Sequence, residues 1–105
     1  MRRAAKVDTN DMSLTTYARS RGWHIETIGL PVDKLGCYLG FFFPIECKRP
    51  ERRGKKDEFT SVQTRYMADC GGKVLVWYTE SCVDRDTDYI AALAKWMTDE
   101  TTDER

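Results

Sequence analysis

The chain has little of what several common classes of protein require. Its 105 residues contain no apolar run near the ~20 residues that a membrane-spanning helix needs. The longest apolar run, residues 38–45, is interrupted by Gly40 and Pro44. The first six residues carry positive charges without an apolar segment behind them, so we expect no secretory signal. These absences favour a cytoplasmic protein that does not contact membranes.

Histidine and closely spaced cysteines are also scarce. His24 is the only histidine, and the four cysteines are too far apart to form a Cys-x-x-Cys pair. The sequence therefore lacks the ligand set of a zinc finger. In a cytoplasmic protein we expect reduced thiols rather than disulfide bonds.

The formal net charge is zero, but the charges are unevenly distributed along the chain. Residues 48–56 carry six positive charges against one negative charge, whereas residues 79–105 contain eight acidic and three basic residues. A flexible cationic loop of this kind favours contact with a polyanion such as nucleic acid. The alternative is a solvated loop in a protein that binds only other proteins.

The spacing of apolar residues predicts a single domain, residues 1–105, with a frayed acidic tail at residues 98–105. The fold class expected from this spacing is α/β (α+β), with a central mixed β-sheet flanked by helices in the order α-β-β-β-α-β-α. The expected helices cover residues 11–21, 58–70 and 87–97, and the expected strands cover residues 23–28, 34–38, 42–48 and 73–78.

Local features refine this pattern. The second and third strands should form a hairpin that turns near residues 39–41. Pro44 indicates an edge position or a bulge, because proline lacks an N–H donor. Asp57 can cap the second helix, whose buried side is expected to be an apolar stripe. That stripe consists of Phe59, Val62, Tyr66 and Cys70.

The segment Ile45-Glu46-Cys47-Lys48 carries the residues best suited to chemistry. On a strand, Glu46 and Lys48 point to one face, whereas Ile45 and Cys47 point into the core. The expected hairpin register brings Asp33 near Glu46. Two neighbouring carboxylates repel each other unless a cation lies between them, and oxygen ligands suit Mg²⁺ or Mn²⁺. The alternative is an ordinary ion pair of Glu46 with Lys48 on an exposed sheet.

Such a cation would activate water and neutralise charge on a phosphodiester, while Lys48 would stabilise the transition state or orient the nucleophile. Gln63 lies in or beside the apolar stripe of the second helix, so its amide needs a hydrogen-bond partner. The amide either satisfies backbone groups inside the core or faces a polar cleft between helix and sheet.

The ordered set Pro31…Asp33, Glu46-Cys47-Lys48 and Gln63-x-x-Tyr66 resembles the PD-(D/E)XK nuclease superfamily. More narrowly, it is similar to small phage-encoded VRR-NUC and Holliday-junction-resolvase-like nucleases, over about residues 2–78. The opening residues 2–10 are similar to the start of many such phage proteins. The expected order of elements also resembles the restriction-endonuclease-like core of that superfamily.

This resemblance implies a metal-dependent endonuclease that hydrolyses DNA phosphodiester bonds, with branched, flap or junction DNA as candidate substrates. It implies Mg²⁺ or Mn²⁺ as the cofactor and a homodimer in the cytoplasm, which would be the host cytoplasm if the protein is phage-encoded. The implied catalytic residues are Asp33, Glu46, Lys48 and Gln63. The implied metal ligands are Asp33, Glu46, the backbone carbonyl of Cys47, and either Asp8 or Asp11. The residues expected to contact DNA are Arg49, Arg52, Arg53, Lys55 and Lys56.

Two departures from the superfamily pattern leave another interpretation open. Val32 separates Pro31 from Asp33, and Ser13 stands where the superfamily usually has a glutamate in the first helix. The alternative function is therefore a catalytically inactive nuclease-like module that binds DNA or acts as an inhibitor.

Overall fold

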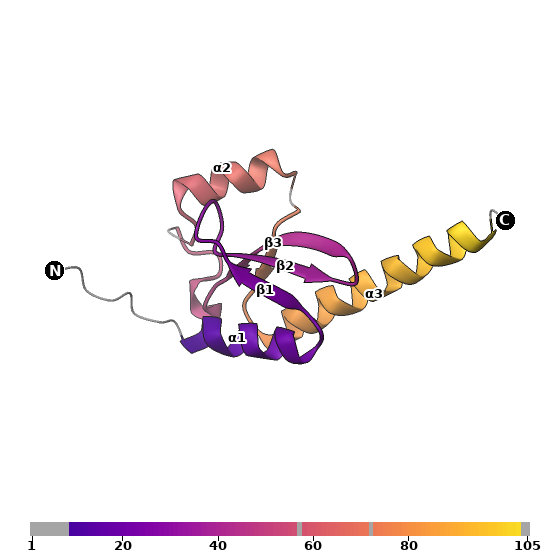
Figure 1. The fold of residues 1–105 in the computed structure, drawn as a ribbon. Helices are drawn as coiled ribbons and strands as arrows, with labels where there is room; N and C mark the ends of the chain where they lie inside the picture. Colours follow the sequence, from indigo (N-terminus) through magenta and orange to yellow (C-terminus); the bar gives the residue numbers. More distant parts are fainter. Residues whose placement is uncertain (1–8, 57, 72, 104–105) are drawn as a thin grey trace.

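Three helices and a four-stranded mixed sheet form the α+β fold of residues 9–56, 58–71 and 73–103, which are the residues that the computed structural model describes (Figure 1). The predicted class, a mixed sheet flanked by helices, is confirmed. The short 3₁₀ helix η1 inside the basic segment was not predicted. The elements are α1 (Thr9–Ser20), β1 (His24–Thr27), β2 (Lys34–Tyr38), β3 (Phe41–Cys47), η1 (Pro50–Arg52), α2 (Ser61–Asp69), β4 (Leu75–Trp77) and α3 (Glu80–Asp103).

The strands lie in the order β1-β2-β3-β4, with the first three antiparallel and β4 parallel to β3. The β2–β3 hairpin turns through Leu39 and Gly40, whose φ angles of 52° and 86° are those that a two-residue hairpin turn requires. Pro44 lies opposite Leu35, one residue before β3 begins to pair with β4 at Ile45. At Pro44, β3 is therefore an edge strand on its β4 side within the described residues, as its missing N–H predicts.

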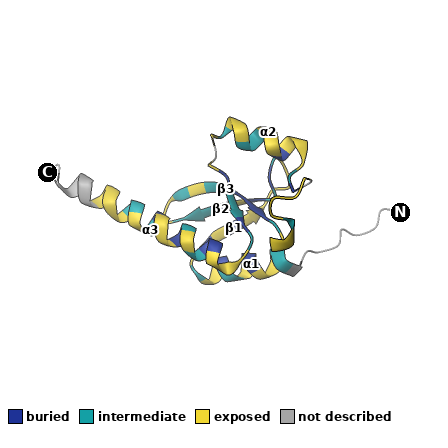
Figure 2. Ribbon diagram, turned by 180° about the vertical axis from the view of Figure 1, so that it is seen from behind, coloured by how far each residue is buried: buried dark blue, intermediate teal, exposed yellow. Residues whose placement is uncertain are grey.

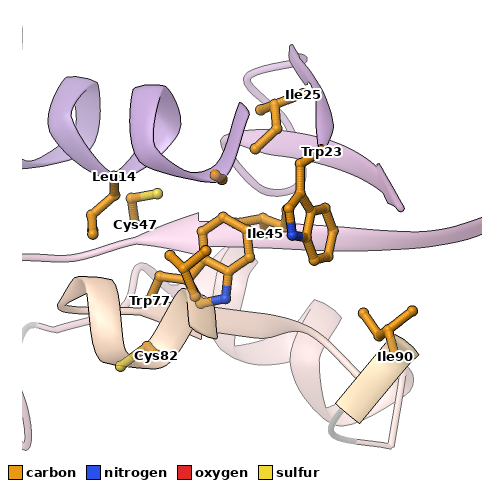
Figure 3. Close-up of a cluster of buried hydrophobic side chains, with 10 residues drawn as sticks. Leu14, Trp23, Ile25, Ile45, Cys47, Trp77, Cys82 and Ile90 are labelled. Carbon is orange, nitrogen blue, oxygen red and sulfur yellow. The ribbon is translucent and has the colours of Figure 1, made fainter. Parts of the chain in front are cut away.

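The hydrophobic core lies between one face of the sheet and the helices α1 and α3 (Figure 3). Ile45 and Cys47 point into it, as predicted, and are 0% and 5% exposed. The rings of Trp23 and Trp77 meet edge to face, with centroids 5.2 Å apart, and Trp23 Nε1 donates a 2.9 Å hydrogen bond to the hydroxyl of Thr87. The buried cluster consists of Leu14, Ala18, Trp23, Ile25, Ile45, Cys47, Trp77, Cys82, Val83 and Ile90.

The last helix is longer than predicted. The expected boundaries at residues 87 and 97 were wrong, because α3 begins at Glu80 and continues to Asp103. Its first half packs on the core through Val83, Thr87 and Ile90, whereas residues 91–98 are intermediate or exposed (Figure 2). Although α3 has 24 residues, no helix in the described part of the chain is apolar enough over a sufficient length to cross a membrane.

The attachment of α2 differs from the prediction. Its N-cap is Thr60 rather than Asp57, and Asp57 lies outside the described residues. Thr60 and Gln63 form a capping box, each side chain accepting a 3.1 Å hydrogen bond from the backbone N–H of the other. The predicted apolar stripe was wrong at Val62, which is 42% exposed, and its other three members are only half-buried. Gln63 is instead the buried residue of α2. A polar side chain therefore docks this helix, which lies on the opposite side of the sheet from α1 (Figure 1).

Candidate active site

Asp33 and Glu46 meet where the β2–β3 hairpin opens toward the rest of the chain. The side chain of Glu46 is 0% exposed, and its Oε2 accepts a 2.7 Å hydrogen bond from the backbone N–H of Asp33. The register that pairs Lys34 with Ile45 brings the preceding residue, Asp33, alongside Glu46. Val32 is 0% exposed, so the residue that separates Pro31 from Asp33 anchors this loop in the protein interior.

The charge of the Glu46 carboxyl group is poorly solvated. Burial raises the pKa of Glu46 from its ordinary value of 4.5 to about 7. The Asp33 carboxylate contributes to this rise through charge repulsion and a hydrogen bond between the two carboxyl groups, while the Asp33 N–H and the charge of Lys48 oppose it. A divalent cation bound between the two carboxyl groups would relieve this repulsion.

Lys48 directly follows β3 and lies beside the Glu46 carboxylate. Its Nζ lies 3.5 Å from Oε1 of Glu46 and donates a 3.2 Å hydrogen bond to Oε1 of Gln63. The ammonium group also lies 5.2 Å from the centroid of the Phe59 ring. The side chain of Lys48 is 18% exposed, so it remains accessible from solvent.

Gln63 connects α2 to the charged residues of the sheet. Its Nε2 donates a 3.0 Å hydrogen bond to Oε1 of Glu46, and its Oε1 accepts hydrogen bonds from Lys48 and from the backbone N–H of Thr60. The amide thus lies between α2 and the sheet, where it forms hydrogen bonds with two charged side chains and one backbone N–H group. One side chain therefore caps α2 and partners both charged residues.

Asp11, one of the two alternative metal ligands predicted near the start of the first helix, is paired with Lys34 rather than with Glu46. Asp11 forms a 2.9 Å ion pair with Lys34 and accepts a 3.1 Å hydrogen bond from the hydroxyl of Thr15. Ser13 lines a hollow between α1 and the start of α3. Asp8, the other predicted ligand from this part of the chain, lies outside the described residues.

Sequence reasoning did not single out two residues that organise this end of the sheet. Asn10 Nδ2 donates hydrogen bonds to the backbone carbonyls of Lys48, at 3.0 Å, and Tyr78, at 3.3 Å. Asn10 therefore holds the ends of β3 and β4 against α1. Lys34 is 7% exposed and paired with Asp11. The only sequence signals for these two residues were the position of Asn10 directly before the first predicted helix and that of Lys34 directly after Asp33.

The basic segment contains the short helix η1 and is tied to the rest of the protein by side-chain contacts. Glu58 is 9% exposed and accepts hydrogen bonds from the backbone N–H of Gly54, at 2.8 Å, and from the hydroxyl of Tyr78. The guanidinium of Arg53 lies 4.6 Å from the centroid of the Tyr78 ring. Of the predicted DNA contacts, Arg49, Arg53, Lys55 and Lys56 are exposed and Arg52 is partly buried. These five residues, here termed the cationic rim, directly follow Lys48 in the chain.

The described residues offer a divalent cation two carboxylates. No group of three or more His, Cys, Asp and Glu side chains suited to a metal occurs among them. The side chain of Cys47 belongs to the hydrophobic core, where burial raises the pKa of its thiol to about 12. The role of the Cys47 backbone carbonyl as a metal ligand stays a prediction. Mg²⁺ is commonly held by one or two carboxylates together with waters and phosphate oxygens. Asp33 and Glu46 therefore fit such an ion.

No protein-family model matches this chain, and no curated protein or solved structure is significantly similar to it. The function is therefore inferred from the motif residues and from their arrangement in the fold.

Proposed function

We propose that this chain is a Mg²⁺- or Mn²⁺-dependent nuclease that hydrolyses phosphodiester bonds in DNA. The observation that carries the proposal is the contact of Asp33 with the buried Glu46, to whose carboxylate Lys48 and Gln63 are also bound. These are the four residues that the motif resemblance implies. The order of the elements, with β4 parallel to β3 after α2, supports a restriction-endonuclease-like core.

Each residue of the site has a distinct role in this proposal. Asp33, Glu46 and the Cys47 carbonyl would hold the cation, which when bound supplies Lewis-acid activation of water and neutralises phosphate charge. Lys48 donates to a phosphate oxygen and stabilises the charge that develops there during hydrolysis. Gln63 orients the Glu46 carboxylate. A single site cuts one strand at a time, so cleavage of both strands would require a homodimer or two binding events.

The cationic rim would hold the phosphates on either side of the scissile bond. Contacts from Arg and Lys to phosphates fix the position of DNA without reading its sequence. The acidic residues of α3 lie on an element that packs against the opposite face of the sheet. Binding would therefore be confined to the face that carries Glu46 and Lys48.

A second candidate function is a catalytically inactive DNA-binding or inhibitory module. The observation that favours it is that both Glu46 oxygens already accept hydrogen bonds within the protein, while Asp11 is paired with Lys34. Such a module would bind DNA at low salt in EDTA, but a divalent cation would not raise its melting temperature.

Incubation with Mn²⁺ and a panel of linear, single-stranded, nicked, flapped and four-way-junction DNAs tests the proposal. We expect cleavage by the wild-type protein, and a loss of at least about 100-fold in rate for Glu46→Gln and for Lys48→Met. Arg85→Ala, on the exposed side of α3, is the matched control and should retain the wild-type rate. Cleavage that persists in folded Glu46→Gln and Lys48→Met proteins would refute the proposed site.

A further inference from the structure

The face of the sheet that carries Glu46 is only partly covered. The helices α1 and α3 pack against the other face, and α2 lies over one end of the Glu46 face (Figure 1). Toward the hairpin end, the Glu46 face has a hollow of about 300 Å³. This hollow, termed the sheet hollow, is lined by His24, Glu26, Leu35, Gly36, Cys37 and Phe42.

The strand register places the sheet hollow on the same face of the sheet as the candidate active site. One row across the strands contains His24, Cys37 and Phe42, because His24 lies opposite Cys37 and Cys37 opposite Phe42. The next row along the same face contains Glu26, Leu35 and Pro44, and the row after that contains Asp33 and Glu46. Glu46 follows Phe42 by four positions on β3, which corresponds to about 13 Å.

The side chains of the sheet hollow suit a flat, uncharged ring. Phe42 is 66% exposed and Leu35 is 37% exposed, so an aromatic face and an aliphatic edge are both open to solvent. The exposed carboxylate of Glu26 repels a phosphate group but accepts a hydrogen bond from an exocyclic amine. This combination selects a nucleobase over the charged backbone of a nucleic acid.

We propose that the sheet hollow binds an unpaired base of the nucleic-acid strand whose phosphodiester lies at Glu46 and Lys48. This inference rests on the proposed function and specifies its substrate class. A base inside a duplex is already stacked and paired, whereas an unpaired base can stack on an exposed aromatic side chain. At about 3.4 Å per nucleotide of a stacked strand, the distance of about 13 Å corresponds to about four nucleotides. The substrate therefore has a single-stranded segment of at least about that length, as a flap or a gap does.

Binding in EDTA tests this inference apart from catalysis. The probes are a fluorescein-labelled 12-nucleotide single strand and a blunt duplex of the same sequence, measured by fluorescence anisotropy. Stacking on one aromatic side chain predicts that Phe42→Ala weakens single-strand binding about 5- to 100-fold and changes duplex binding less than about twofold. Phe42→Trp should retain the affinity. Tyr89→Ala is the matched control, since Tyr89 is 65% exposed and lies on α3.

The outcomes separate this inference from the proposed function. Equal single-strand binding by Phe42→Ala and Tyr89→Ala would overturn the inference, even if the wild-type protein cleaves DNA. Loss of a homodimer in Phe42→Ala, seen by sedimentation velocity, would also overturn it, because the sheet hollow would then bind protein. Binding that depends on Phe42 without any cleavage by the wild-type protein would support the base-binding hollow and refute the hydrolytic function.

Discussion

The backbone N–H of Asp33 donates a hydrogen bond of 2.7 Å to the carboxylate of Glu46, a residue 13 positions later in the chain. The loop that presents Asp33 is held by the fully buried Val32, and Glu46 lies near the end of β3, an inner strand of the sheet. The fold itself therefore holds these two residues together. The predictions below follow from this enforced proximity and from the contacts around it.

In metal-free protein, stability should fall as the pH rises from about 5 to 7. Glu46 titrates near its ordinary pKa of 4.5 when unfolded, but burial raises its pKa to about 7 in the folded state. Between these values the folded state binds a proton that the unfolded state has released, so folding is favoured at the acidic end and less so above pH 7. The expected loss is on the order of 1–3 kcal/mol.

Denaturant unfolding in EDTA at several pH values measures this loss. Glu46→Gln should remove the pH dependence in that window, whereas Glu26→Gln, which changes an exposed carboxylate on the same face, should keep it. Addition of Mg²⁺ at pH 8 should recover stability in the wild-type protein only. An identical pH profile for wild type and Glu46→Gln would contradict this assignment.

Gln63→Ala should release α2 from the sheet. The substitution removes half of the capping box and leaves Glu46 without one of its donors, so we expect a cost of about 1–3 kcal/mol. Hydrogen exchange over residues 61–69 should accelerate more than exchange in α1. Thr64→Ala, an exposed change in the same helix, should cost less than about 0.5 kcal/mol. Equal exchange rates in the two variants would show that Gln63 does not dock the helix.

Gly36→Ala should destabilise the domain through overpacking. A Cβ at this position would overlap Cδ1 of Ile45 and come within 3.0 Å of the Trp23 ring, and both of these side chains are buried. We expect a cost of about 1–3 kcal/mol in thermal or denaturant unfolding. Ile45→Val removes the overlapping methyl group, so the double variant should be more stable than the sum of the single changes predicts. Strict additivity would argue against this contact.

Lys55→Ala should reduce the salt dependence of DNA binding. If Lys55 in the cationic rim neutralises one phosphate, the slope of log affinity against log salt concentration should fall by about one. Arg85→Ala, on α3 and paired with Asp86, should leave the slope unchanged. Equal slopes for the two variants and the wild type would exclude Lys55 from the interface.

The central part of the fold and the carboxylate pair could be predicted from the sequence because they depend on local rules. Alternation fixed which residues of β3 face the core, as Ile45 and Cys47 do. A two-residue turn at Leu39 and Gly40 fixes the hairpin register, and the register brings Asp33 beside Glu46. Both rules act within about fifteen residues of chain.

The start of α3, the docking of α2 and the pairing of Asp11 could not be predicted, because polar side chains stand at positions where a hydrophobic pattern would be expected or pair over long distances in the chain. The start of α3 resembled a polar loop because residues 80–86 are mostly polar or charged, and only Cys82 and Val83 among them are buried. The docking of α2 depends on Gln63, which no hydrophobic periodicity detects. The pairing of Asp11 with Lys34 joins residues 23 positions apart, and no local pattern specifies such a contact.

Binding of Mn²⁺ to the free protein, followed by electron paramagnetic resonance at pH 8, tests most directly whether Asp33 and Glu46 hold a divalent cation. We predict saturable binding of Mn²⁺ by the wild-type protein, a loss of at least about tenfold in affinity for Asp33→Asn and for Glu46→Gln, and wild-type affinity for Glu26→Gln. Wild-type protein that binds no Mn²⁺, or that binds it as tightly after Asp33→Asn and Glu46→Gln, would contradict the metal-dependent site.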